Sequence, residues 1–214
     1  MSKELTENGR RRLPRQERER LIVEEAIRFF ADVGLEGQTR ALADRLGVTQ
    51  PLLYRYFPDK DALIERVFSE ISAGGWDPAW SAALADRSRP LAERMVEFYG
   101  NYICMNFGRE RLRLFMYASL KDQDAARRYL SFVRTHLLLP LVAELRAEAG
   151  LDLSRPVDEA EVECVAGLHG AIAYVAARRW IYGDPAATDE RALVRQQVQT
   201  FLEGAAVTMK RLAP

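Results

Sequence analysis

The chain has 214 residues, and its 31 basic and 31 acidic side chains give a formal net charge of zero at pH 7, so any contact with nucleic acid must depend on local charge. Only two cysteines, Cys104 and Cys164, are present and lie far apart in the sequence, which argues against a disulfide framework and favours a reducing compartment. The N-terminal segment lacks the apolar core of a signal peptide, and no uninterrupted apolar run reaches the roughly 18 residues of a membrane span, so we expect a cytoplasmic protein with no membrane partner.

The spacing of apolar residues is helical from Arg15 onward, and no segment alternates as a β-strand does. The sequence therefore predicts an all-α fold in which glycine and proline mark the helix ends. Residues 76–88 are expected to form a less regular connection, and Pro140 is expected to bend the helix that contains it. In chain order the expected helices cover about residues 15–33, two short segments within 39–57, and then 59–73, 89–107, 109–120, 122–149, 157–182 and 188–212.

The segment from Thr39 to Phe57 has the spacing of a helix-turn-helix, although an ordinary pair of short bundle helices would share it. Ala43 supplies a small residue where the two helices would cross, and Gly47 supplies the turn four positions later. Thr49 is placed to cap the second helix through its hydroxyl, and Pro51 falls in the first turn, where backbone N–H groups lack intrahelical partners. The apolar residues spaced to fill the interior between the helices are Leu42, Leu46, Val48 and Leu53.

Polar side chains occupy the face that this assignment leaves exposed. Gln50 can pair with adenine, Arg55 with guanine or phosphate, and the hydroxyls of tyrosines such as Tyr54 with phosphate oxygens. Thr39 and Lys60 each begin a predicted helix, where backbone N–H groups favour phosphate. This combination of side chains indicates a helix that contacts bases in the major groove and is flanked by residues that contact phosphates.

The sequence resembles the tetracycline-repressor (TetR) family of bacterial transcription regulators. The resemblance covers roughly the first third of the chain, and it runs through Ala26, Phe30, Gly34, Thr39, Leu42, Ala43, Gly47, Val48, Thr49, Leu53, Tyr54, Phe57, Lys60 and Leu63. It implies a three-helix DNA-binding domain, an all-helical ligand-binding domain and a homodimer joined through the last two helices. The family's usual contacts with double-stranded DNA fall here on Thr39, Thr49, Gln50, Pro51, Tyr54, Arg55, Tyr56 and Lys60.

Two positions depart from the family pattern. Pro51 stands where many members have glycine or another small residue, and Tyr56 stands where histidine is common. The expected domains are a flexible basic tail over residues 1–14, the helix-turn-helix domain over 15–58, and an effector-binding and dimerisation domain over 59–214.

Apolar and aromatic residues on the middle helices are candidates for a ligand pocket, because such sites are mostly apolar with a few polar groups. An ordinary core explains the same residues equally well. An effector held there would be apolar or amphipathic. The candidate ligand-binding residues are Tyr102, Phe107, Phe115, Phe132, His136, His169 and Tyr174.

Small residues on the penultimate helix recur at helical spacing and would let another helix approach closely. Together with apolar residues of the last helix they predict a four-helix dimer interface, while the alternative is packing within one subunit. The candidate interface residues are Gly170, Ala173, Ala177, Val194, Val198, Phe201, Leu202 and Ala205.

The leading functional hypothesis is a ligand-responsive transcription regulator, a repressor released from a palindromic operator by a small molecule. The alternative is a constitutive dimeric DNA-binding protein without an effector. No catalytic residue, metal ligand or cofactor is predicted, because Cys164 and His169 are five residues apart, on different sides of a helix, and no CxxC or HExxH spacing occurs.

Overall fold

The computed structural model describes residues 14–73, 76–121, 123–184 and 189–212, and within these ranges it contains helices and no strand. The predicted all-α fold class is therefore confirmed. The tail expected over residues 1–14 lies outside the described residues, apart from Pro14.

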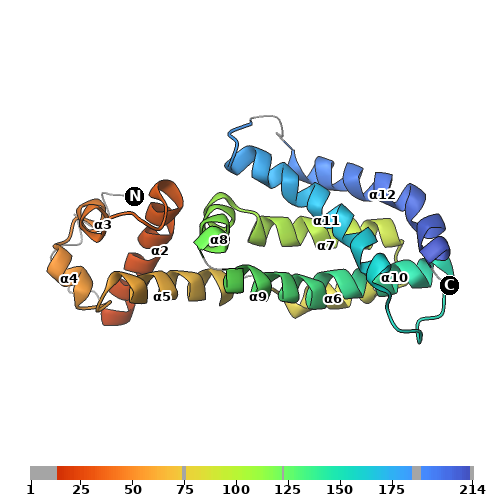
Figure 1. Cartoon of the computed structure of the whole chain (residues 1–214), viewed down its shortest axis with the longest axis horizontal. Coiled ribbons are helices and arrows are strands. Elements are labelled where there is room, and N and C mark those ends of the chain that lie inside the picture. Colours follow the sequence, from red (N-terminus) through yellow and green to blue (C-terminus); the bar gives the residue numbers. More distant parts are fainter. Residues whose placement is uncertain (1–13, 74–75, 122, 185–188, 213–214) are drawn as a thin grey trace.

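The N-terminal helices α2 (Arg15–Val33), α3 (Thr39–Leu46) and α4 (Gln50–Tyr54) gather at one end of an elongated molecule (Figure 1). Helix α5 (Lys60–Ala73) packs on α2 and extends from this end toward the second half. The predicted bounds of α2 are matched at both ends, and the backbone of Gly34, with φ of +86°, terminates the helix.

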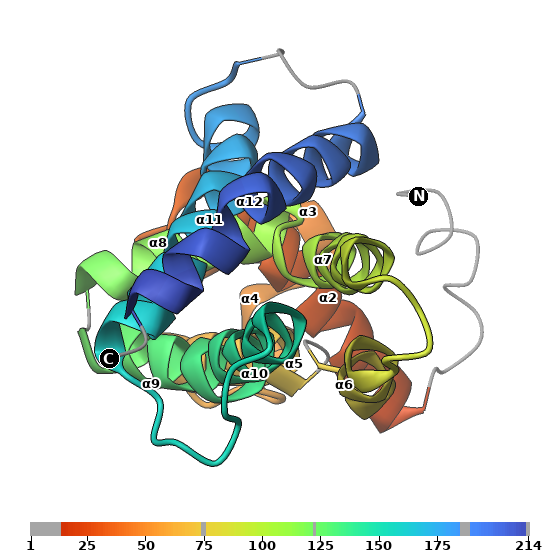
Figure 2. The ribbon, with the colours of Figure 1, turned by 90° about the vertical axis from the view of Figure 1, so that its right-hand side faces the viewer.

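The second half is a larger helical assembly. Its helices are α6 (Pro78–Ala85), α7 (Leu91–Asn106), α8 (Arg109–Lys121), α9 (Gln123–Val133), the π-helical turn η1 (Arg134–Leu138), α10 (Leu139–Ala149), α11 (Glu159–Trp180) and α12 (Glu190–Leu212). Viewed along the long axis, α11 and α12 lie on one side and α6, α9 and α10 on the other (Figure 2). Helix α7 packs against both α12 and α6 and so joins the two sides.

Two hydrophobic clusters follow this division. The N-terminal cluster contains apolar residues of α2 to α5, such as Phe30 and Leu53, and also Leu114 of α8. The C-terminal cluster contains buried residues of α6 to α12, such as Tyr102 and Val165. Because Leu114 is fully buried in the N-terminal cluster, α8 belongs to both halves of the molecule.

Two expectations about helices are corrected. Residues 78–85 form α6 rather than an irregular connection, because the Asp77 carboxylate accepts a hydrogen bond from the backbone N–H of Ala79 at 2.9 Å and Pro78 occupies the first turn. The disruption expected at Pro140 takes the form of the π-helical turn η1 just before it, which leaves Pro140 near the start of α10.

Helix α11 is long and apolar enough, by length and composition alone, to cross a membrane. In the structure it packs against α8, α10 and α12, and Val165 and Ile172 are buried in the C-terminal cluster. Glu161 in its first turn is fully buried and binds the Arg146 guanidinium. These contacts are those of a core helix in a globular protein.

Candidate functional site

Helices α3 and α4 form the predicted helix-turn-helix. Gly47 ends α3 in the left-handed region with φ of +67°, and its N–H donates to the Asp44 carbonyl while the N–H of Val48 donates to the Ala43 carbonyl. A Cβ at Gly47 would meet no atom within 4 Å, so the backbone angle rather than crowding favours glycine here. Leu42, Ala43 and Leu53 are buried as predicted.

A polar network joins the start of α3 to α4. Gln50 Nε2 donates to Thr39 Oγ1 at 3.0 Å, and Thr39 Oγ1 lies 2.9 Å from Tyr54 Oη. If the Thr39 hydroxyl donates to Tyr54, the Tyr54 O–H remains free to donate outward, and so does the second hydrogen of the Gln50 amide. Thr39 is only 6% exposed, so its main contact is this network, through which it holds the two larger side chains in place.

The other predicted DNA contacts differ in exposure. Thr49, Pro51 and Arg55 are exposed, whereas Tyr56 is half-buried and has the Arg15 guanidinium 5.9 Å from its ring centroid. Thr49 occupies the N-cap position of α4, but its side chain makes no cap hydrogen bond, which corrects the predicted role of its hydroxyl. That hydroxyl faces solvent and is free for a ligand.

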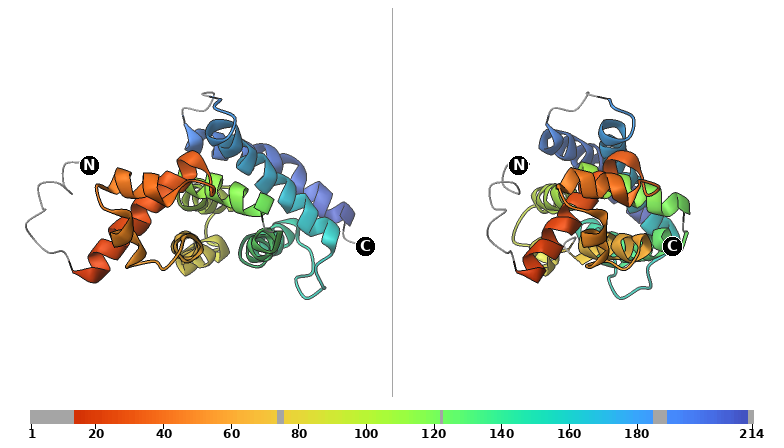
Figure 3. Two further views of the ribbon diagram at one scale, coloured as in Figure 1. Left: turned by 60° about the vertical axis from the view of Figure 1, so that its left-hand side comes forward. Right: turned by 90° about the vertical axis from the view of Figure 1, so that its left-hand side faces the viewer.

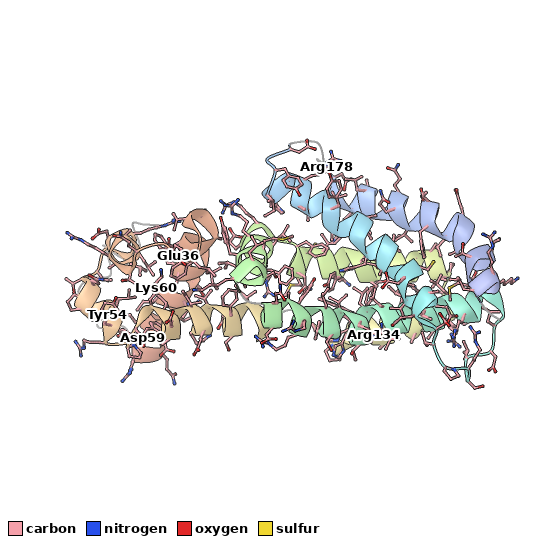
Figure 4. All side chains as sticks on the ribbon, in the orientation of Figure 1. Glu36, Tyr54, Asp59, Lys60, Arg134 and Arg178 are labelled. Carbon is pink, nitrogen blue, oxygen red and sulfur yellow. The ribbon has the colours of Figure 1, made fainter. Side chains whose placement is uncertain are left out.

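Lys60 begins α5, one residue later than the predicted start at Asp59. Asp59 Oδ1 accepts a hydrogen bond from the backbone N–H of Ala62 at 2.7 Å, so a carboxylate already caps this helix. A phosphate contact at this point would involve the Lys60 ammonium, since the Ala62 N–H is already bonded to the Asp59 carboxylate. Tyr54, Asp59 and Lys60 lie at the same end of the molecule, away from Arg134 and Arg178 (Figure 4).

Arg113 of α8 connects the two halves, a role that the sequence analysis missed. Its Nε donates to the carbonyl of Ala31 near the end of α2 at 2.5 Å, and its Nη1 donates to the carbonyl of Trp180 at the end of α11 at 3.2 Å. Its Nη2 donates to Tyr117 Oη at 3.0 Å. The left view of Figure 3 shows α8, in green, against the end of α2. Several arginines occur on α8, and nothing local in the sequence distinguishes this one.

A second link passes through Asp32 at the end of α2. Its carboxylate binds Arg109 of α8 at 2.7 Å and Arg45 of α3 at 2.9 Å. The hydrogen bond from Arg45, together with Arg109, holds the pKa of Asp32 below its ordinary value. Asp32 thereby joins α8 to α2 and α3.

In the second half, three predicted ligand-binding residues meet. The His169 ring centroid of α11 lies 5.7 Å from that of Tyr102 and 5.8 Å from that of Phe107, and 6.4 Å from that of Tyr99. We call Tyr99, Tyr102, Phe107 and His169 the aromatic cluster. Tyr102 Oη is satisfied by Tyr129 Oη at 2.8 Å, and the Tyr129 ring lies 4.4 Å from Phe115 between centroids.

Two polar atoms of the aromatic cluster are buried without a hydrogen-bond partner among the described residues, namely Tyr99 Oη and His169 Nδ1. Burial lowers the pKa of His169 to about 4 and raises that of Tyr99 above its ordinary value, so both groups are neutral near pH 7. Buried polar groups normally have hydrogen-bond partners, so these two atoms are exceptions among the described residues.

The remaining ligand-binding predictions divide. Phe132 and His136 pack on each other and on the ring of Trp76. The Trp76 ring also contacts Phe98, which precedes Tyr99 of the aromatic cluster. Tyr174 is 57% exposed on the outside of α11, so it cannot line a pocket in the interior. The predicted list is corrected at that residue.

The predicted dimer residues also divide by burial. Gly170 is exposed, and Ala173, Ala177, Phe201 and Leu202 are partly buried. The buried residues are Val194, Val198 and Ala205, which α12 directs onto the C-terminal cluster. They therefore have no exposed surface that could contact a partner subunit. The exposed face of α11 instead carries a stripe at helical spacing of Glu163, Gly167, Gly170 and Tyr174.

Within the described ranges, no group of three or more His, Cys, Asp or Glu side chains is arranged to hold a metal ion.

Comparisons with known proteins agree with this architecture. The profile of bacterial regulatory proteins of the tetR family matches residues 22–67, which covers α3, α4 and most of α2 and α5. The tetracycline repressor protein class C of Escherichia coli is 49% identical over 45 residues, which are 21% of this chain and 20% of that protein. The class A tetracycline repressor protein from transposon 1721, also in Escherichia coli, is 33% identical over 85 residues, or 36% of this chain and 39% of that protein. The chain thus matches less than half the length of either relative.

Solved structures extend the likeness in fold to nearly the whole chain. A TetR-family transcriptional regulator from Mesorhizobium loti has a TM-score of 0.60 and 15% identity, covering 91% of this chain and 98% of that one. A TetR-like transcriptional regulator from a Rhodococcus species has a TM-score of 0.64 and 21% identity, covering 90% and 100%. Residues 22–67 thus match the N-terminal domain of the tetR family of bacterial regulatory proteins, and nearly the whole chain shares the fold of solved regulators described as TetR-family or TetR-like.

Proposed function

We propose that the protein is a homodimeric repressor that binds a palindromic operator through α3 and α4 and leaves it when a small molecule occupies the C-terminal half. The observation that carries the proposal is the polar network of Thr39, Gln50 and Tyr54, which orders exposed hydrogen-bonding groups beside Arg55. In a helix-turn-helix the start of the second helix meets base edges, while hydroxyls and basic side chains contact phosphates.

The domain division proposed from the sequence, 15–58 for DNA and 59–214 for effector and dimer, agrees with the separation of the polar network from the aromatic cluster. The hydrophobic clusters overlap this boundary, because Leu63 of α5 and Leu114 of α8 belong to the N-terminal cluster. We infer that α5 and α8 connect the functions.

The release mechanism follows from this connection. Two recognition helices of a dimer enter successive major grooves only when they are roughly 34–36 Å apart. A ligand that binds the aromatic cluster better when α8 is displaced would change the separation of the recognition helices through Arg113 and Asp32. The loss of operator affinity would equal the difference between the ligand's affinities for the DNA-bound and the displaced conformations. A cytoplasmic location follows if the protein is such a regulator.

The test of DNA binding is a selection from random duplex DNA followed by anisotropy titration of the retained sequence. We expect a palindrome whose half-sites lie about one helical turn apart. Arg55→Ala should weaken binding by about tenfold or more, whereas Arg134→Ala, an exposed arginine of the other half, should leave it unchanged. Equal effects of the two substitutions would mean that another surface meets DNA.

Gln50 is the proposed base reader. Gln50→Ala should relax specificity at one base position at a cost of about 1–3 kcal/mol, and an unchanged preferred site would remove it from that role. The alternative function, a constitutive DNA-binding protein, predicts that no small molecule raises the melting temperature or changes operator affinity.

A further inference from the structure

Helices α7 and α12 pack side by side and leave a cleft between their outer faces (Figures 1 and 2). Ile103 of α7 and Leu193 of α12 line one small pocket, so the end of α7 faces the start of α12. The cleft is a different space, with a volume of about 390 Å³. Small-molecule sites in proteins usually measure roughly 300–1,000 Å³, so the cleft has room for a ligand.

Three half-buried residues of α7, namely Ala92, Val96 and Gly100, form the apolar part of the cleft. They are spaced four residues apart and therefore share one face of the helix. Gly100 lies in the interior of α7, where glycine makes a helix less stable than alanine does. A Cβ at Gly100 would meet no atom within 4 Å, so packing among the described residues does not require glycine there. A larger side chain at this position would enter the cleft.

The charged side chains of the cleft are unequal in number. Arg89 of α7 binds Glu97 at 2.7 Å, and Glu93 is the second carboxylate of the described lining. Helix α12 contributes Arg191 and Arg195, and neither guanidinium has an ion pair or hydrogen bond with another described residue. These two arginines are four residues apart and so lie on the same face of α12. The lining therefore has one positive charge in excess and two guanidinium groups that can bind a ligand.

We propose that the cleft between α7 and α12 binds a small organic monocarboxylate, with its carboxylate at Arg191 and Arg195 and its apolar part along Ala92, Val96 and Gly100. A planar guanidinium donates two parallel hydrogen bonds to a carboxylate, and one negative charge balances the excess charge of the lining. The site is separate from the aromatic cluster. It goes beyond the proposed function and does not depend on operator binding.

The test is calorimetric titration of the full chain with hexanoate, hexanol and acetate. Hexanol keeps the apolar chain without the charge, and acetate keeps the carboxylate without most of the chain. We expect hexanoate to bind about tenfold more tightly than either, and to bind more weakly as salt is added, because the two arginines are exposed. Equal binding of hexanol, equal binding of acetate as an adventitious ion only, or no binding of hexanoate would each overturn the proposal.

Matched arginine variants locate the carboxylate. Arg195→Gln should weaken hexanoate binding by about tenfold, because it removes one of the two guanidinium groups. Arg211→Gln removes the same charge from the exposed last turn of the same helix and should leave hexanoate binding unchanged. Equal losses in the two variants would mean that hexanoate is attracted to the charge of α12 in general, and would contradict a site in the cleft.

Substitutions of Gly100 test the position of the apolar chain without loss of folding. Gly100→Leu should fill the cleft and abolish hexanoate binding, while raising the melting temperature of the free protein because leucine favours a helix more than glycine does. Gly100→Ala should also raise the melting temperature but retain most of the binding. Hexanoate binding that survives Gly100→Leu would place the ligand elsewhere and overturn the proposal. If hexanoate does not bind and Gly100→Leu changes the oligomeric state in sedimentation, the cleft is an interface between copies of this chain instead.

Discussion

The two polar sites of this molecule differ in how their hydrogen bonds are satisfied. At the DNA-facing end, Thr39, Gln50 and Tyr54 bond to one another and still present groups to solvent. In the aromatic cluster, the buried atoms Tyr99 Oη and His169 Nδ1 have no hydrogen-bond partner among the described residues. The side chains of the outer site are therefore held in place by one another, whereas the two atoms of the inner site are not held by hydrogen bonds to the described residues.

The ion pairs of the two halves also differ, and substituting them should give the largest change in the free energy of unfolding. Arg146 and Glu161 form a buried ion pair in the C-terminal half, while Arg45 binds Asp32 and Glu25 in an exposed network of the N-terminal half. Arg146→Met should lower the free energy of unfolding by about 3 kcal/mol, because it leaves the buried Glu161 carboxylate with only Arg155 and the backbone N–H of Asp158 as partners. Arg45→Met should cost about 1 kcal/mol or less. Urea denaturation of both variants measures the difference, and similar losses would contradict it.

Acid should affect the inner site before the outer one. Burial lowers the pKa of His169 to about 4 from its ordinary 6.5. Between these pH values the unfolded chain binds a proton that the folded chain does not, so stability is greatest above pH 6.5 and falls on acidification by up to about 3 kcal/mol. The Arg146 guanidinium holds the pKa of Glu161 below its ordinary value, so that carboxylate contributes only at lower pH.

The measurement is the free energy of unfolding from urea titrations between pH 7 and pH 4. His169→Gln should flatten the loss between pH 6.5 and pH 4.5, and the wild type measured at the same pH values is the reference. A slope that persists in His169→Gln would assign the loss to other groups.

A substitution at Arg113 should uncouple the unfolding of the N-terminal half from that of the C-terminal half. Arg113→Met removes hydrogen bonds to Ala31, Trp180 and Tyr117, and should cost about 2 kcal/mol. All three tryptophans, Trp76, Trp80 and Trp180, lie in the second half, so their fluorescence reports that half alone while circular dichroism reports both. We expect the two melting curves to coincide in the wild type and to separate in the variant. Arg111→Met is the control, because the one hydrogen bond that Arg111 donates among the described residues is to the Ile71 carbonyl in α5.

The sequence predicted most of this fold and only part of its sites, for reasons that particular residues make clear. Helix ends marked by Gly34 and Gly47 were predictable, because a left-handed backbone favours glycine locally. Helix α6 was missed because Gly74, Gly75 and Pro78 are typical of a connection in the sequence, whereas Pro78 lies in the first turn of α6, after the Asp77 cap. The burial of Val198 and the connection through Arg113 depend on which helices pack together. Helical periodicity identifies the apolar face of a helix but not the helix that packs against it.

The smallest expected effect tests whether the outer site is ordered in advance. Thr39 is too buried to make a large contact with DNA, so Thr39→Val should weaken operator binding by about 1 kcal/mol through loss of its bonds to Tyr54 and Gln50. Tyr54→Phe should weaken binding by more, since it removes both the network bond and the hydroxyl offered to phosphate. Because both substitutions break the same bond, the double variant should lose less affinity than the sum of the two single losses. Simple additivity in anisotropy titrations would mean that Thr39 and Tyr54 act independently, and that the network does not prepare the surface for DNA.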